Sequence, residues 1–461
     1  MDHQEKPTDW SKLSQLFSDS ISSQSQDLQL KAIITFAHLS KQAPESIIAS
    51  AVPILINLLG TTPNPTVQEA VAYSLMLLTR RIDGPFAQII GQLGAIPTIL
   101  RLLPDSESGH RRCLLKCLSG IVAFDNSNRV ILARNGGLQC VIDAIVSRDD
   151  DMRKYLLEIL TALAMLREVR RVIVGYGGLP FLVEAVSYGK MISRTRAAQA
   201  IGLLGVSRRV KHMLMELGVV EALIGLLRDG DDSGRIIAGN ALGVVSSHVN
   251  YLRPVAQAGA IPLYMELLRG NDVLGKEVAE DVFCVLAVAE ENAVLILDHL
   301  VSVLEGNEGQ EAKAAAIDVI WNLSGYKHSI SVVRESGAIP VLIRFLRDGN
   351  LDLREKASAT IAQLSYEEEN RGAMEEEGVI PILIELLQDG SEELREYAAE
   401  SLINFAEDSR YSEGVSVAFE IPSFLPIRER LFRIRASDED MTRSMRLLSV
   451  EQLITSDFDS V

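Results

Sequence analysis

The chain has 461 residues, about three times the typical length of one domain. Hydrophobic residues make up 47% of it, enough for a large core, and only 5% are aromatic, which favours Leu- and Ala-rich helices packed on helices. The formal net charge of −17 argues against generic nucleic-acid binding, so we expect no nucleic-acid partner.

The compartment follows from what the sequence lacks. Four cysteines do not make a disulfide framework in a chain of this length, and no apolar stretch follows Met1 as in a signal peptide. The longest apolar runs, such as residues 47–59, are shorter than the ~18 residues of a membrane-spanning helix. We therefore expect a soluble protein in the cytoplasm, the nucleus or both, with no direct membrane insertion.

Residues 1–26 are rich in Ser and Gln, yet they contain apolar side chains at helical spacing. These are Trp10, Leu13, Leu16, Phe17 and Ile21. The pattern predicts a helix that caps the core of the following segment, because the ends of a repeat array must be covered.

A repeat dominates residues 27–435. Gly-Ala-Ile-Pro or Gly-Val-Ile-Pro precedes a Leu-rich run at Gly94, Gly259, Gly337 and Gly378, and weaker copies start at Gly137, Gly178 and Gly218. Successive copies lie 40 to 43 residues apart, except for 78 residues between Gly259 and Gly337. That interval fits two units, one of them shortened and without its glycine near Leu295. Pro53 is expected to open a copy before Gly94, and Pro422 a degenerate last copy.

Each unit is predicted to contain helices. Leu353, Ala357, Ile361 and Leu364 fall on one stripe of a helix with 3.6 residues per turn. The glycine ends a short helix by taking a positive φ, and the proline fits the first turn of the next helix. The unit is therefore a short helix, a glycine turn, a second helix, a polar turn and a long third helix.

This pattern resembles the armadillo repeat in its "GAIPxLxxLL" segment and in the following "REKASATIAQLS" or "AAAIDVIWNLS". HEAT repeats are the nearest alternative, but the Gly-x-Ile-Pro turn favours armadillo. The repeats are similar to plant-type armadillo proteins and to the repeat halves of U-box ubiquitin ligases; no U-box pattern is visible in the chain. The resemblance implies an all-α, right-handed superhelical solenoid of about ten repeats.

In the armadillo family, the third helices line a concave groove that holds extended peptides. The resemblance implies that an asparagine near the end of each third helix, and the residue four positions earlier, face the ligand. The matching positions form our candidate groove, namely Tyr73, Lys116, Glu158, Gln199, Asn240, Asp281, Asp318, Asn322, Gln363, Glu400 and Asn404. None is the tryptophan of importin-α, and Trp321 is expected to point away and pack, so a classical import receptor is disfavoured.

Charge is unevenly distributed along the repeats. Residues 101–215 contain 18 Lys and Arg against 10 Asp and Glu, whereas residues 216–461 contain 21 against 44. The acidic half could hold basic extended segments of a partner, and the basic region could hold acidic ones. Solvated helix faces that keep the chain soluble, or end-to-end self-association, explain the same distribution.

No motif predicts catalysis. The segment from Gly270 to Lys276 imitates a phosphate-binding loop, but Glu277 stands where Ser or Thr must bind magnesium. His110, Cys113 and Cys117 share a helix face, yet zinc needs four ligands, so the cysteines are interpreted as core residues or exposed thiols. We expect no enzyme activity, no metal site and no cofactor.

Residues 436–461 form an acidic tail in which Met441, Met445, Leu448 and Leu453 are spaced as on an amphipathic helix. It is either a C-terminal cap or a tethered interaction helix. The leading hypothesis for the whole chain is a non-catalytic adaptor or scaffold that binds other proteins. The alternatives are a substrate-presenting subunit of a ubiquitin ligase, a transport receptor for basic cargo, and a structural anchor.

Overall fold

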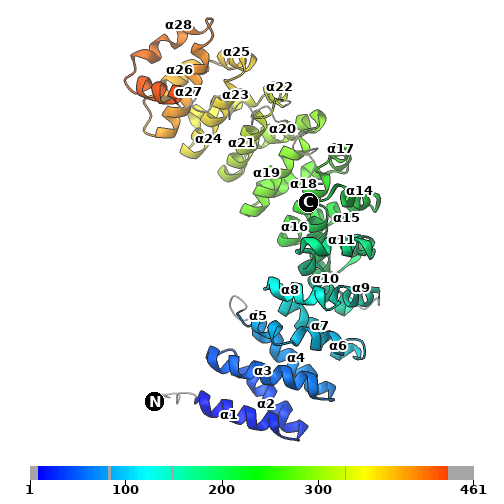
Figure 1. Cartoon of the computed structure of the whole chain (residues 1–461). Helices are drawn as coiled ribbons and strands as arrows, with labels where there is room; N and C mark the ends of the chain where they lie inside the picture. Colours follow the sequence, from blue (N-terminus) through cyan, green and yellow to red (C-terminus); the bar gives the residue numbers. More distant parts are fainter. Residues whose placement is uncertain (1–8, 81–84, 147–149, 328, 434–461) are drawn as a thin grey trace. The chain divides into compact units, whose positions relative to one another are not determined.

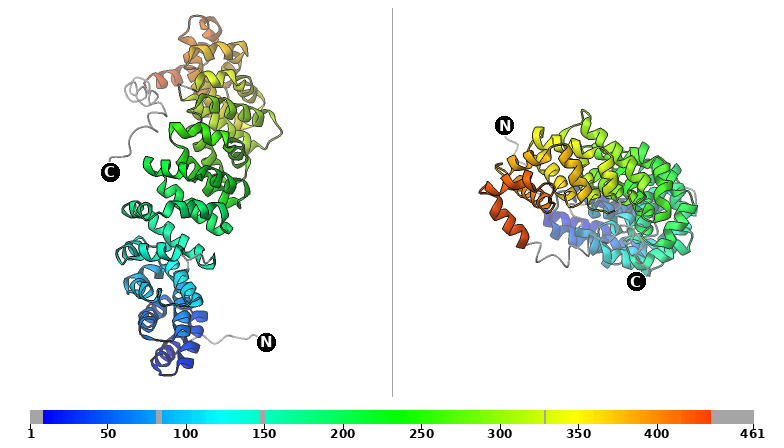
Figure 2. Two further views of the ribbon diagram at one scale, coloured as in Figure 1. Left: turned by 90° about the vertical axis from the view of Figure 1, so that its right-hand side faces the viewer. Right: turned by 90° about the horizontal axis from the view of Figure 1, so that it is seen from above.

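The computed structural model describes residues 9–80, 85–146, 150–327 and 329–433 (Figure 1). Within these ranges all regular structure is helical and no strand occurs, so the prediction of an all-α fold is confirmed. The chain divides into two compact units, residues 1–204 and 205–461, here called the first and the second unit. Figure 2 shows that the helices of each unit lie in successive layers that follow the order of the sequence.

The first unit begins with α1 and continues with repeated sets of helices. Its helices are α1 (Trp10–Ser22), α2 (Gln26–Leu39), α3 (Glu45–Thr61), α4 (Pro65–Thr79), α5 (Pro85–Gln92), α6 (Ala95–Leu102), α7 (Ser108–Ala123), α8 (Asn126–Arg134), α9 (Gly137–Val146), α10 (Asp150–Ala164), α11 (Arg167–Gly175), α12 (Gly178–Tyr188) and α13 (Met191–Leu204). The long third helices of the repeats are α2, α4, α7, α10 and α13, and each packs on the next. Helix α1 packs on both α2 and α3, with the Phe17 and Phe36 rings 4.8 Å apart.

The second unit repeats the same arrangement. It contains α14 (Arg208–Glu216), α15 (Val219–Asp229), α16 (Asp232–Ser246), α17 (Val249–Gln257), α18 (Ala260–Arg269), α19 (Val273–Leu286), α20 (Glu290–Glu305), α21 (Gln310–Ser324), α22 (Ile330–Glu335), α23 (Ala338–Asp348), α24 (Leu351–Leu364), α25 (Glu368–Glu376), α26 (Val379–Leu386), α27 (Glu392–Ala406), α28 (Ser412–Val415) and a 3-10 helix (Ser416–Glu420). Residues 424–433 are also helical. The third helices α16, α19, α21, α24 and α27 pack on one another in this order.

Local sequence signals start and stop these helices. The predicted stripe on α24 is buried, with Leu353, Ala357, Ile361 and Leu364 at most 4% exposed. The polar turns supply caps for the third helices: the side chains of Asp231, Asp272, Asn350 and Ser391 each accept a hydrogen bond from the backbone N–H three residues later. Such a cap satisfies a donor that the first turn of a helix otherwise leaves unpaired.

The glycine turns lie where the sequence predicts them, with two corrections. Gly94, Gly218, Gly259, Gly337 and Gly378 have φ between 68° and 90°. In the weaker copies, however, the positive φ belongs to Gly136 and Gly177, one residue before Gly137 and Gly178. Gly137 and Gly178 lie inside the next helix, where an added Cβ would approach Leu132 and Ile173.

Two repeats lack the turn between their first and second helices. The shortened repeat near Leu295 contains the single helix α20, with Ile296, Leu297 and Leu300 fully buried. The expectation that Pro53 opens a helix is wrong, because Pro53 lies inside α3. No glycine precedes it to take a positive φ at low cost, so the helix continues through the proline.

Among the described residues, no helix is both long and apolar enough to cross a membrane. The proposed boundary at residue 436 and the tail residues Met441, Met445, Leu448 and Leu453 lie outside the described residues.

Replacing Gly177 by Ala should lower the free energy of unfolding by about 1 kcal/mol, because Ala is strained at a φ of 75°. Gly175 provides a matched control two residues away, since it also has open space around its Cβ position but lies in helical backbone. Gly175→Ala should leave stability equal or higher. Equal denaturant midpoints for the two variants would contradict this account of the turn.

Candidate peptide-binding surface

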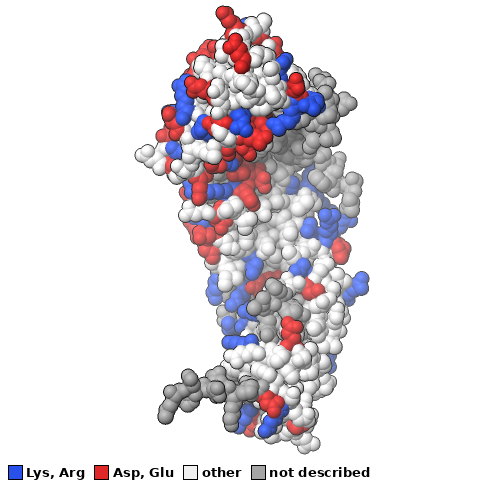
Figure 3. Space-filling model, turned by 90° about the vertical axis from the view of Figure 1, so that its left-hand side faces the viewer, with Lys and Arg blue, Asp and Glu red and all other residues white. Residues whose placement is uncertain are grey.

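The candidate groove is built from the third helices. Because α16, α19, α21, α24 and α27 pack in succession, equivalent positions on neighbouring helices lie side by side in the second unit. The residues left uncovered on each helix then form one strip of a continuous face. Figure 3 shows Asp and Glu side chains gathered on the second unit, in the upper part of this view.

In the first unit, the predicted groove residues contact cationic groups of the chain itself. Tyr73 is 49% exposed, and Lys116 Nζ lies 5.7 Å from its ring centroid. Glu158 lies 4.0 Å from Arg196, whose guanidinium also donates a hydrogen bond to Gln199 over 3.2 Å. Tyr73 and Lys116 therefore form one cation–π pair, and Glu158 and Gln199 are joined separately through Arg196.

In the second unit, most of the predicted residues reach the surface. Asn240 and Asp281 are exposed, whereas Asp318, Asn322, Gln363 and Glu400 are half-buried.

Asn404 differs from this expectation. Its side chain is 1% exposed, and its Nδ2 donates a hydrogen bond to Ser365 Oγ over 2.7 Å. Asn404 therefore joins α27 to α24 inside the packing and is not presented to a ligand.

Trp321 is exposed where the sequence predicts a packed side chain. The expectation that it points away and packs is wrong, because 45% of the residue is exposed. Positions i, i+3 and i+4 share one face of a helix, so Trp321 lies on the same side of α21 as Asp318 and Asn322. The three-residue spacing between Asp318 and Trp321 is the sequence signal for this placement.

Glu280, which was not among the predicted groove residues, has a strongly raised pKa on this face. Glu280 of α19 is half-buried, and its pKa is raised to about 7. Burial is the largest cause, and the charge of Asp318 on α21 is the next. Asp281 and Glu277 raise the pKa further, whereas Lys356 of α24 lowers it. No repeat consensus marks position 280, so only the contacts between repeats identify it.

Lys356 bridges two repeats beside Glu280. Its Nζ donates hydrogen bonds to both carboxylate oxygens of Asp318, each over 2.7 Å. Burial still raises the pKa of Asp318 despite this contact with Lys356. The three side chains therefore form a row across α19, α21 and α24.

A second acidic group lies on α24 and α27. Ser391 Oγ donates a hydrogen bond to Glu355 over 2.7 Å, and the Tyr366 hydroxyl donates one to Glu400. Burial raises the pKa of Tyr397, and the charges of Glu400, Glu396, Glu393 and Glu355 raise it further. Tyr366 and Tyr397 therefore lie close to carboxylates of α24 and α27.

A known protein family matches most of the repeats. The model of the family described as the plant U-box protein ARM repeat region matches residues 96–406, more than half of the chain. The chain belongs to this family. The armadillo (ARM) identification made from the Gly-x-Ile-Pro turns is therefore confirmed.

One solved structure agrees on the fold. An engineered protein from the Northeast Structural Genomics Consortium has a TM-score of 0.67 at 21% identity, over 86% of this chain and 99% of its own. A second engineered protein from the same consortium has a TM-score of 0.45 at 22% identity, over 50% of this chain and 94% of its own. This similarity is too low to support the fold assignment. A search of curated proteins finds no match.

Within the described ARM repeats, the segments that imitate catalytic or metal motifs have structural roles. In the segment that resembles a phosphate-binding loop, Asp272 caps α19, and Lys276 lies 3.2 Å from Glu311 of α21. On α7, His110 and Cys117 are buried, and burial raises the pKa of Cys117 to about 12. Among the described residues, no three His, Cys, Asp or Glu side chains are arranged to hold a metal ion.

Several arginines of the basic region hydrogen-bond to backbone carbonyls. The Arg111 guanidinium donates to the carbonyls of Leu103, Pro104 and Ser106. Arg170 and Arg194 donate to the carbonyls of Ala164 and Val186, each over 2.7 Å. These arginines satisfy carbonyls at or near helix ends, so part of the positive charge in residues 101–215 has a role inside the repeats.

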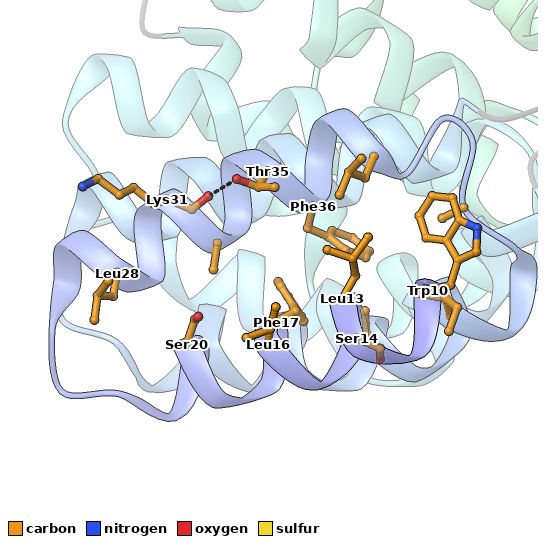
Figure 4. Close-up of a pocket in the computed structure, with 15 residues that line it drawn as sticks. Trp10, Leu13, Ser14, Leu16, Phe17, Ser20, Leu28, Lys31, Thr35 and Phe36 are labelled. Carbon is orange, nitrogen blue, oxygen red and sulfur yellow. Dashed lines mark hydrogen bonds between the residues drawn. The ribbon is translucent and has the colours of Figure 1, made fainter. Parts of the chain in front are cut away.

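A separate cavity of about 280 Å³ lies between α1, α2 and α3 (Figure 4). Trp10, Leu13, Leu16, Phe17 and Phe36 line it, and carbon makes up most of its wall. Its polar lining includes Ser14, Ser20, Lys31 and Thr35, and the Thr35 hydroxyl is already bonded to the Lys31 carbonyl. We assign no ligand to it.

Asn404→Ala should lower the free energy of unfolding by about 1 to 3 kcal/mol, because it removes a buried hydrogen-bond donor from between two repeats. Asn322→Ala is the matched control, since it removes the equivalent amide from a half-exposed position and should cost well under 1 kcal/mol. Chemical denaturation followed by circular dichroism compares them. If both cost the same, Asn404 does not have the proposed structural role.

Glu280→Gln should stabilise the protein at pH 8 and have little effect near pH 5. A carboxyl whose folded pKa of about 7 exceeds its ordinary value binds more protons folded than unfolded, so its ionisation between these values destabilises the folded state as pH rises. After allowance for solvent screening, the gain at pH 8 is on the order of 1 kcal/mol. Melting temperatures across this range measure it, and a pH-independent difference would contradict the assignment.

Proposed function

We propose that the chain is a non-catalytic, protein-binding scaffold whose second-unit third-helix face holds an extended, basic segment of a partner. The observation that carries the proposal is the crowding of carboxylates on that face. The pKa of Glu280 is raised to about 7, first by burial and then by the negative charge of Asp318, Asp281 and Glu277, which Lys356 only partly offsets. An arriving Lys or Arg side chain relieves this repulsion.

The other groups on the face suit the same ligand. The amide of Asn322 can pair with the backbone of an extended peptide, because it offers both a donor and an acceptor. The exposed indole of Trp321 can stack on a guanidinium or an aliphatic stem. The helices are already packed, so little ordering cost falls on the scaffold when a segment binds.

A second candidate role has specific support. The matching family is described by the ARM region of plant U-box proteins, so this chain could present substrates to a ubiquitin ligase. In that role the same face would hold the substrate, and the ligase would contact another surface. We further propose a cytoplasmic or nuclear location, with which the unpaired state of all four cysteines agrees.

The test uses a 12-residue, end-blocked peptide of alternating Arg and Ser, carrying a fluorophore, and a matched peptide with Glu in place of Arg. We expect binding of the Arg peptide by the intact protein, measured by fluorescence anisotropy, and no binding of the Glu peptide. The Asp281→Asn/Asp318→Asn variant should bind the Arg peptide about tenfold or more weakly, a loss of at least ~1.4 kcal/mol. Binding should also weaken steeply toward ~0.5 M salt, where screening shortens to a few Å.

The control variant Asp298→Asn/Glu305→Gln removes the same formal charge from exposed positions of α20, outside the third-helix face. It should bind the Arg peptide nearly as well as the unmodified protein. Equal losses in the two double variants would show that net charge alone attracts the peptide. The proposed groove would then be wrong.

A further inference from the structure

Three side chains on consecutive third helices form a row whose charge can change near neutral pH. Glu280 lies on α19, Asp318 on α21 and Lys356 on α24. Lys356 contacts both oxygens of Asp318, and these two side chains are 31% and 35% exposed. The lysine is therefore already committed to one carboxylate, while Glu280 beside it is the second carboxylate of the row.

The groups around Glu280 make its ionisation costly. On its own helix, Glu277 and Asp281 are close enough to act on it, and Asp318 does so from α21. The nearby thiol of Cys284 stays protonated, since burial and the charges of Asp281 and Glu280 raise its pKa to about 12. Lys356 is the cation that acts on Glu280 from α24.

Cations on α19 itself and on α16 and α17, which pack against it, are paired with other carboxylates. Arg235 of α16 pairs with Glu266 of α18 at 2.8 Å, and Arg253 of α17 pairs with Glu291 of α20 at 2.9 Å. Lys276, one turn before Glu280, pairs with Glu311 at 3.2 Å.

We infer that the protonation state of Glu280 controls how tightly this face binds a basic segment. The inference rests on the proposed function and concerns its regulation. With Glu280 protonated, the row of Glu280, Asp318 and Lys356 carries no net charge. With Glu280 ionised, the row gains one negative charge beside Glu277 and Asp281, and it attracts a cation that the neutral row does not.

The direction of the pH effect follows from linkage. In the free protein Glu280 loses its proton around pH 7. A bound Lys or Arg side chain stabilises the carboxylate and so lowers this pKa, which means that binding releases a proton. Affinity is then highest above pH 7 and falls as pH drops through 7. If the bound carboxyl stays ionised, the loss between pH 8 and pH 6 is about tenfold.

The experiment measures the dissociation constant of the Arg-Ser peptide at pH 6, 7 and 8 at constant ionic strength. This peptide is suitable because its arginines and blocked ends do not titrate in that range. We expect about tenfold weaker binding at pH 6 than at pH 8. Glu280→Gln should bind with the weaker affinity at every pH. Glu277→Gln removes the same formal charge one turn earlier, and it should keep the pH dependence even if its affinity drops.

A second measurement follows the proton directly. Titration calorimetry in two buffers of different ionisation enthalpy should report about half a proton released on binding at pH 7 by the unmodified protein, because Glu280 is about half protonated there, and none by Glu280→Gln. If the peptide binds with the same affinity at all three pH values, or if Glu280→Gln keeps the dependence, the inference is wrong and the proposed function stands. If the peptide binds at no pH, both are wrong.

Discussion

A single repeat of this chain cannot cover its own apolar side, and the need for a neighbouring repeat governs the rest of the structure. The third helices show the consequence most clearly. On α24 the stripe from Leu353 to Leu364 is almost completely buried, because α24 lies between α21 and α27. Packing therefore fixes the residues on the flanks of each third helix and leaves one strip open on each.

Local devices keep the helices of each repeat at defined ends. A glycine with positive φ separates the first helix from the second, a polar side chain caps the third, and arginines such as Arg111 bind carbonyls near helix ends. Where the glycine is missing, as before Pro53, the two helices fuse into one. The repeat thus tolerates loss of a turn, because burial of the combined helix α3 or α20 is retained.

The open strips are where this chain differs chemically from a generic stack of helices. Residues there do not have to pack, so charge can gather without loss of the core. In the second unit that freedom places Glu280, Asp318 and Lys356 in a row across three repeats. Burial and the neighbouring carboxylates together raise the pKa of Glu280, and in the proposed function a basic partner segment relieves the repulsion between those carboxylates.

The sequence alone determined the helical class, the repeat period and the shortened repeat without a glycine near Leu295, because these depend on spacing and on backbone preferences that act within a few residues. The same local preferences place two turns one residue too late. Gly136 and Gly177 each precede another glycine, and the sequence does not show which glycine of the pair takes the positive φ. Whether an individual side chain is buried or exposed was decided by tertiary structure. Asn404 matched a groove position yet is buried against Ser365, while Trp321 was expected to pack and is exposed. Glu280 carried no sequence signal at all, because its pKa depends on burial and on charges that reach it from α21 and α24, and only the packing of one repeat on the next brings those charges close.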